Sequence, residues 1–195
     1  MNISIDPQFI AETAVRLVQI DSTNPSLSPD GAGEAEAARL TADILTQLGL
    51  NVDSYEIAPG RWNVVGRLPG QGSGRSLLLN AHLDTVGVEG MADPFSAELR
   101  NGRLYGRGSL DMKGSLAAML GAAKTIVESG VGLAGDLLVT AVADEEHSSI
   151  GMEHLVQTVT ADGAIVTEPT DMQLFLVGHG RYQQIPGQPH AAFHD

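Results

Sequence analysis

Short apolar runs without polar alternation constrain the fold of this chain more than any other feature. They lie at 76–81, 137–143, 164–167 and 173–177. A strand that is apolar at successive positions is buried on both faces of its sheet. Helical patterns at 112–128 and 152–158 separate the first three runs. This alternation predicts the α/β class, as a three-layer αβα domain with a mixed, largely parallel sheet.

The first hundred residues add helices and strands of ordinary length. Apolar spacing predicts helices over 6–20 and 34–48, and alternation predicts strands over 51–57 and 62–68. The pair Asn101-Gly102 predicts a hairpin turn.

The periodic pattern ends near residue 178, and prolines then follow at short intervals. We therefore expect a domain over 1–178 that is incomplete at its C-terminal end. An irregular tail is expected over 179–195.

Charge and composition narrow the class of partner. The formal charge is −13, from 24 acidic against 11 basic residues, which argues against nucleic acid or an anionic membrane as a partner. The chain has no cysteine, so thiolate zinc sites are excluded. No signal peptide is recognisable at the N-terminus and no apolar run approaches 18 residues, so we expect a cytoplasmic protein.

Potential metal ligands follow the first three apolar runs, at the point where each of these predicted strands ends. They are His82 with Asp84 two residues later, the adjacent pair Glu145-Glu146, and Glu168. Asp111 lies beyond a glycine-rich turn, at the start of a predicted helix. Open α/β sheets place their sites beyond the carboxyl ends of the strands. Imidazole and carboxylate groups gathered there are suited to a divalent metal.

Each of these signals has a simpler interpretation when taken alone. An isolated His-x-Asp is more often a pair of surface residues, and Asp111 could serve only as a helix N-cap. The pair Glu145-Glu146 could be a solvated acidic loop, although adjacent carboxylates at the end of a buried strand repel each other without a cation. Their joint occurrence favours a site.

The remaining histidines carry less weight. His147 and His154 are interpreted as surface residues flanking the acidic pair, and His179, His190 and His194 fall in the predicted tail.

Several motifs in order resemble a known family. They are His82-Leu83-Asp84-Thr85-Val86, the stretch 106–114 that ends in Asp111-Met112-Lys113-Gly114, Asp144-Glu145-Glu146, and Glu168-Pro169-Thr170. Together they are similar to the dinuclear-zinc amidohydrolases and peptidases. That family includes acetylornithine deacetylase, succinyl-diaminopimelate desuccinylase, aminoacylase and glutamate carboxypeptidase. The similarity extends from about residue 9 to residue 182.

The resemblance implies a role for each residue. His82 and Glu168 would bind one zinc, Asp111 would bridge two metals, and Glu146 would bind the second. Glu145 would be the general base, and Asp84 would hold the imidazole of His82.

The resemblance also implies features that this chain lacks. The family's remaining zinc ligand is a histidine that follows an inserted lid domain, and nothing here matches it. The lid would begin near 178–182, where residues 183–189 replace the expected alternating strands, so 179–195 is expected to be a stub of the lid connection.

The expected function is hydrolysis of an amide bond in an N-acyl amino acid or small peptide, with weak or no activity in a chain of this length. One or two zinc ions are the expected cofactor, and carboxylate-rich sites also accept cobalt or manganese. The partner would then be a small-molecule substrate. Two alternatives stay open: a non-catalytic metal-binding or interaction module that retains half of the fold, and a truncated product without function.

Overall fold

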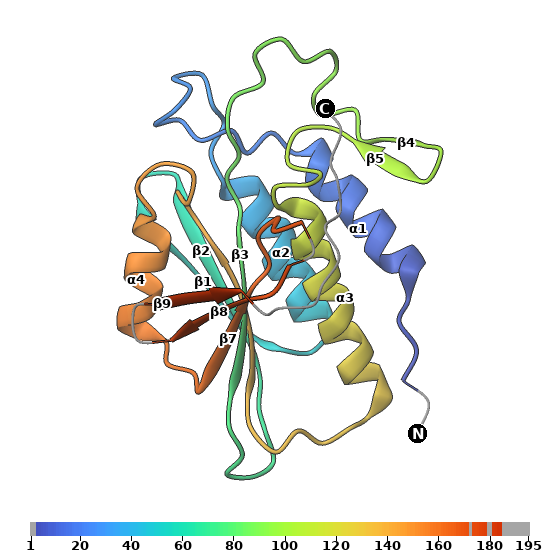
Figure 1. The fold of residues 1–195 in the computed structure, drawn as a ribbon, viewed down its shortest axis with the longest axis vertical. Coiled ribbons are helices and arrows are strands. Elements are labelled where there is room, and N and C mark those ends of the chain that lie inside the picture. Colours follow the sequence, from blue (N-terminus) through green and yellow to red (C-terminus); the bar gives the residue numbers. More distant parts are fainter. Residues whose placement is uncertain (1–2, 172, 179–180, 185–195) are drawn as a thin grey trace.

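A computed structural model of the chain describes residues 3–171, 173–178 and 181–184. Within them, five strands form one sheet in the order β1-β2-β6-β3-β7 (Figure 1). These strands are β1 (Asn51–Ala58), β2 (Arg61–Leu68), β3 (Leu77–His82), β6 (Leu137–Val142) and β7 (Gly163–Val166). The helices are α1 (Pro7–Gln19), α2 (Ala35–Gln47), α3 (Lys113–Ser129) and α4 (Ile150–Thr158). A separate small hairpin joins β4 (Glu98–Arg100) to β5 (Arg103–Tyr105).

The sheet is mixed. β3 lies between β6 and β7 and is parallel to both, whereas β2 is antiparallel to β1 and to β6. The carboxyl ends of β3, β6 and β7 therefore meet at one edge of the sheet, the upper edge in Figure 1.

Helices cover both faces of the sheet, so the predicted three-layer αβα architecture is confirmed. α1, α2 and α3 lie on one side and α4 on the other (Figure 1). Alternate residues of β6 divide between two cores: Val139 packs with the three-helix layer and Leu138 with Leu155 of α4. β6 is buried at all six positions, as its apolar sequence predicts. Among the described helices, none has the length and apolarity needed to cross a membrane.

Local sequence chemistry explains where α1 begins and why α1 and α3 can approach each other closely. Asp6 caps α1 by accepting a hydrogen bond from the backbone N–H of Phe9, and Pro7 occupies the first turn. α1 and α3 pack closely at Gly121, where an added Cβ would lie 2.4 Å from a side-chain carbon of Ile10. A larger residue at position 121 would therefore force this helix contact to shift.

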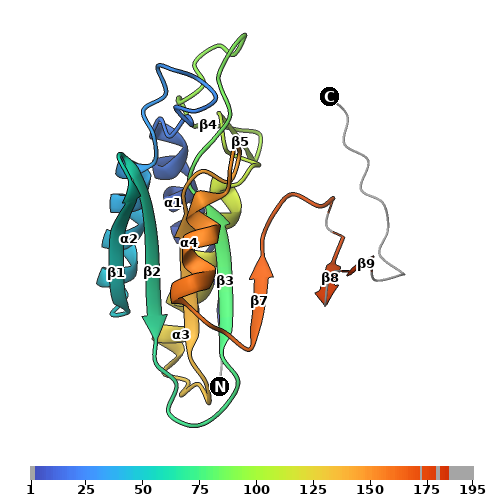
Figure 2. The same cartoon turned by 90° about the vertical axis from the view of Figure 1, so that its left-hand side faces the viewer.

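Two predictions about the last strands are wrong. β7 is not buried: it lies at the sheet edge, paired in the described chain only with β3, and all four of its residues are exposed. The run 173–177 does not join the main sheet. It contributes to β8 (Phe175–Gly178), which pairs with β9 (Arg181–Gln184) in a hairpin that stands apart from the sheet (Figure 2).

The predicted irregular tail is also wrong for residues 181–184, which form β9. The rest of that segment, 179–180 and 185–195, lies outside the described residues. The domain boundary at residue 178 stays a prediction.

The packing of α3 on the sheet gives a first testable expectation. Leu120 is fully buried in the core, so Leu120→Ala should reduce the free energy of unfolding by about 2–5 kcal/mol through lost burial and a cavity. Leu110→Ala is the control, because Leu110 is 58% exposed, and its effect should stay within about 0.5 kcal/mol. Urea unfolding of both variants measures the difference. Equal losses would contradict the packing described for α3.

Candidate metal centre

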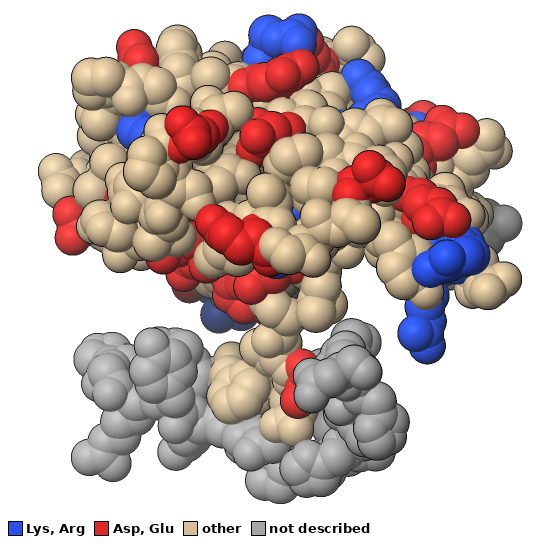
Figure 3. All heavy atoms as spheres, turned by 90° about the horizontal axis from the view of Figure 1, so that it is seen from above, with Lys and Arg blue, Asp and Glu red and all other residues tan. Residues whose placement is uncertain are grey.

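The predicted ligands come together at the edge where β3, β6 and β7 end. His82 is the last residue of β3, and the turn that follows β6 carries Glu145 and Glu146. Glu168 lies two residues beyond β7, and Asp111 immediately precedes the N-cap of α3. Figure 3 views the molecule from this side, where acidic side chains outnumber basic ones.

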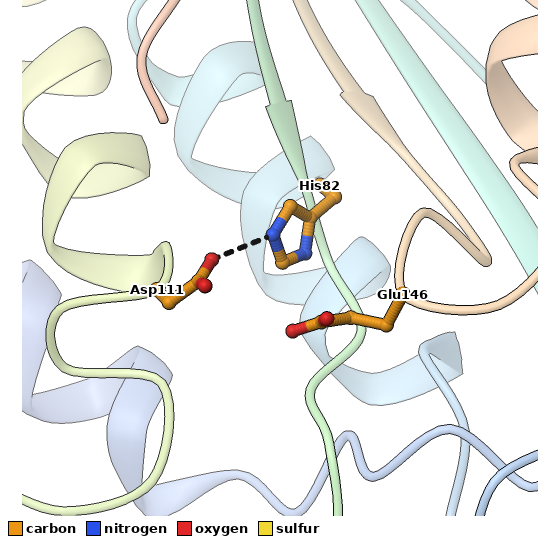
Figure 4. A group of neighbouring side chains, drawn as sticks. All are labelled: His82, Asp111 and Glu146. Atoms are coloured by element: carbon orange, nitrogen blue, oxygen red, sulfur yellow. Dashed lines mark hydrogen bonds and ion pairs between the residues drawn. The ribbon is translucent and has the colours of Figure 1, made fainter. Parts of the chain in front are cut away.

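His82 is the common centre of this group. Its side chain is 1% exposed, and its Nε2 lies 3.0 Å from Asp111 Oδ1. The same nitrogen is 3.8 Å from Glu168 Oε2 and 3.9 Å from Glu145 Oε2. Glu146 joins His82 and Asp111 in a set of potential ligand atoms that all lie within 4.8 Å of one another. Figure 4 shows Asp111 and Glu146 extending toward the imidazole from different segments.

Asp84 lies beneath His82 and is 1% exposed. His82 Nδ1 is 2.9 Å from the backbone carbonyl oxygen of Asp84 and 3.5 Å from its carboxylate. Donation from Nδ1 leaves Nε2 free as a metal ligand. The Asp84 carboxylate also accepts hydrogen bonds from the backbone N–H groups of Glu145 and Glu146. Asp84 thus connects the imidazole with the acidic turn.

The electrostatics of the cluster fit a divalent cation. Burial, then nearby carboxylates, raise the pKa of Glu168 to about 7 against the opposing effect of His82. Burial also raises the pKa of Glu146. Burial opposes the charge of His82, but Asp84, Glu168 and Asp111 raise its pKa to about 10. In the described chain no lysine or arginine forms an ion pair with the carboxylates of Asp111, Glu145, Glu146 or Glu168, and the ion pairs that these carboxylates do form are with His82 alone. A metal would supply the missing positive charge.

The N-cap interpretation of Asp111 is not supported. The N-cap of α3 is Met112, without a side-chain capping bond, and the Asp111 side chain instead contacts His82. The peptide bond between Asp111 and Met112 is cis.

His147 and His154, both interpreted from the sequence as surface residues, differ in their burial. His147 flanks the acidic turn, with Nδ1 3.9 Å from Asp144 Oδ1. His154 is half-buried rather than a surface residue, with its ring centroid 5.1 Å from that of Tyr55. The predicted tail histidines, at 179, 190 and 194, lie outside the described residues.

Asn24 contacts this cluster but is not identified from the sequence. Asn24 Nδ2 donates to Asp84 Oδ2 at 2.7 Å, beneath the cluster. In the sequence, Asn24-Pro25 indicates only part of a helix-breaking segment, because turn-forming residues are common in any loop. Nothing in the single sequence distinguishes this asparagine.

The affinity of this cluster for a divalent metal such as zinc should rise with pH, since bound metal and bound protons compete. His82, with its pKa near 10, carries a proton at neutral pH in the metal-free site, and Glu168 gains one as the pH falls through about 7. The logarithm of the affinity should therefore rise by about one unit per pH unit above pH 7 and more steeply below it. Competition with a chromophoric chelator from pH 6 to 8.5 measures this slope. An affinity independent of pH would contradict the proposed involvement of His82.

Comparison with known proteins places the chain among hydrolases. The model of "Peptidase family M20/M25/M40" matches residues 78–185. The chain is 40% identical over 140 residues to the N-formyl-4-amino-5-aminomethyl-2-methylpyrimidine deformylase of Bacillus subtilis strain 168, covering 68% of this chain and 33% of that protein. The deformylase of the same name from Halalkalibacterium halodurans is 36% identical over 170 residues, covering 84% and 40%. This chain thus spans a third to two fifths of these relatives.

A solved structure shares the fold. The Zn-dependent exopeptidase of Parabacteroides distasonis superposes with a TM-score of 0.61 at 15% identity, over 87% of this chain and 64% of that one.

Proposed function

The chain belongs to peptidase family M20/M25/M40, and from this premise we propose that its acidic cluster binds zinc and serves the hydrolysis of an amide bond in a small acylated substrate. The observation that carries the proposal is the convergence of His82 with carboxylates from separate segments of the chain. Imidazole and carboxylate ligands with room for water are typical of hydrolytic zinc sites.

The proposed ligand assignment follows the contacts of His82. His82 and Glu168 would bind one zinc, with Asp111 bridging to a second that Glu146 also binds. The distances of 3.0 Å and 3.8 Å from His82 Nε2 to Asp111 and Glu168 support the first of these sets. Among the described residues, only Asp111 and Glu146 are proposed for the second metal, fewer than the three or four protein ligands that zinc usually takes. We therefore propose weak turnover for these 195 residues.

Glu145 is proposed as the general base. Zinc would act as a Lewis acid that lowers the pKa of water to about 7. The Glu145 carboxylate would take a proton from the attacking water and pass it to the nitrogen of the leaving amine. Its side chain is 42% exposed and its Oε2 lies 3.9 Å from His82 Nε2, so it borders the ligand set and is open to substrate. Asp84 would orient His82 from below.

We propose two classes of acylated substrate, which differ in the acyl group and in the amine that carries it. The first is an N-acyl amino acid or small peptide, consistent with the peptidase family. The second is an N-formyl aminomethylpyrimidine, favoured by the two relatives that carry this deformylase name at 40% and 36% identity. A formyl group is the smallest acyl group, so its binding requires the fewest contacts with side chains around the metal.

A hydrolysis panel tests the function. The zinc-loaded chain is incubated with N-formyl-4-amino-5-aminomethyl-2-methylpyrimidine, N-acetylornithine and a dipeptide, and the released amine is quantified. We expect zinc-dependent hydrolysis of at least one, with cobalt or manganese able to replace zinc. Zinc binding without hydrolysis of any would favour a non-catalytic metal-binding module. Hydrolysis that persists after metal removal would contradict the proposal.

A further inference from the structure

A network of buried polar residues lies directly beneath the metal centre. Its members are each at most 6% exposed: Asn24, Glu34, Arg61, Asp84 and Asp144. They come from five separate places in the sequence, so the network joins the start of β2 and the loop after α1 to the turn that carries the acidic pair.

Asn24 is the link between two of the carboxylates. Its Nδ2 donates to Asp84 Oδ2 at 2.7 Å and to Asp144 Oδ1 at 2.9 Å. Its Oδ1 accepts a hydrogen bond from Arg61 Nη1 at 3.0 Å. The amide can satisfy these partners in one orientation only, because its NH₂ must face the carboxylates and its oxygen the guanidinium.

Arg61 supplies positive charge to this network. Its Nη2 lies 2.9 Å from Glu34 Oε1 and 2.5 Å from Asp144 Oδ1. No other lysine or arginine of the described chain forms an ion pair with Glu34, Asp84 or Asp144. A planar guanidinium can reach both carboxylates and the asparagine oxygen at once, which a point charge cannot.

The network ends at the proposed reactive residues. Asp144 has a positive φ of 62°, uncommon for a residue other than glycine, and it immediately precedes Glu145. Its N–H donates to Glu34 and its carboxylate is held by Arg61 and Asn24. Asp84, held by Asn24, contacts both His82 and the N–H groups of the acidic pair. Fixing Asn24 thus fixes the imidazole and the turn together.

We propose that Asn24 is a positioning residue of the metal centre, which orients His82 and the Glu145-Glu146 turn through Asp84 and Asp144, and that Arg61 fixes the orientation of its amide. This rests on the proposed function, because it assumes that His82 is a ligand. Groups that orient metal ligands typically contribute 10- to 100-fold to metal affinity.

Asn24→Ala should therefore weaken zinc binding by about 10- to 100-fold, measured by competition with a chromophoric chelator. Asn80→Ala is the matched control. Asn80 is 3% exposed and its side chain accepts a hydrogen bond from Thr140, which lies outside the network. This control should lose stability yet bind zinc as the parent chain does, a difference that a merely structural role of Asn24 would not produce.

Arg61→Lys provides a second variant if Asn24→Ala fails to fold. It keeps the positive charge but cannot reach Asn24, Asp144 and Glu34 together, so zinc binding should weaken by about 10-fold. The proposal is overturned if the folded Asn24→Ala, or Arg61→Lys in its place, binds zinc within twofold of the parent chain. A parent chain that binds no zinc, or binds it equally well after His82→Ala, would overturn the proposed function and this inference with it. Loss confined to the network variants would support both.

Discussion

Glu145→Gln should lower amide hydrolysis by the zinc-loaded chain by about 10²- to 10⁴-fold, the usual contribution of a positioned general base. The amide has nearly the shape of the carboxylate but cannot accept the proton of the attacking water. This loss corresponds to a barrier higher by roughly 3–5 kcal/mol. Zinc content should stay at the parent level, because the proposal gives Glu145 no ligand role. Released amine and bound zinc are measured on the same preparations.

Two further glutamates sharpen this experiment. Glu146→Gln should lower the occupancy of the second metal, because the proposal makes Glu146 a ligand of that metal together with the bridging Asp111. Glu153→Gln is the control, because Glu153 is an exposed residue of α4, and it should change neither quantity. If Glu145→Gln loses metal and Glu146→Gln loses only turnover, the two roles have been assigned in reverse.

His82→Ala should weaken zinc binding by more than the 10- to 100-fold that loss of an outer hydrogen-bonding partner costs. Two groups of potential ligand atoms share the imidazole as their nitrogen donor, one with Asp111 and Glu146 and the other with Glu145 and Glu168. Its removal leaves only carboxylates, which repel one another without it. Equilibrium dialysis followed by elemental analysis measures retained zinc.

His147→Ala is the matched control for this loss. His147 lies beside the acidic turn, but its side chain contacts Ser148 and Asp144 rather than the proposed ligands, so the variant should retain zinc. His82→Asn provides a less disruptive substitution if the alanine variant fails to fold, because His82 is buried. Unchanged retention in the His82 variants, or loss in His147→Ala alone, would show that the ligand has been misidentified.

Much of the fold could be predicted because local chemistry and tertiary packing agree. The capping of α1 by Asp6 and the positive φ of Gly49, just beyond α2, are turn and cap signals that depend on neighbouring residues alone. β6 is buried at every position, as its apolar sequence indicates. The sequence is enough to predict an element when the signal is its own pattern of apolar residues or a capping residue at its end.

Exposure of β7 could not be predicted for the opposite reason. Its residues Ile165 and Val166 are apolar but 46% and 51% exposed, since burial depends on which elements lie beside a strand, and a run of four residues carries no such information. The run at 173–177 misled in a related way. β8 pairs with its neighbour β9 in a local hairpin, and whether a strand also joins the main sheet depends on long-range contacts that its own residues do not specify.

Some residues of the candidate site could likewise be predicted from the sequence, and others could not. Ligand-type residues could be found from their positions after apolar strands, because parallel strands bring their carboxyl ends to one edge. Asn24 and Arg61 could not, because each acts through contacts with residues far along the chain, such as Asp84 and Asp144. A neutral amide in a loop and an arginine at the start of a strand occur in many proteins without any role at a site.

Anomalous X-ray diffraction at the zinc absorption edge, from crystals grown with zinc, tests the central claim most directly. A zinc ion should appear about 2.0–2.1 Å from His82 Nε2 and about 2.0–2.2 Å from carboxylate oxygens of Asp111 and Glu168. Glu145 should border the ion without binding it. Zinc bound elsewhere on the chain, with no anomalous peak beside His82, would contradict the account of this edge of the sheet as a metal centre.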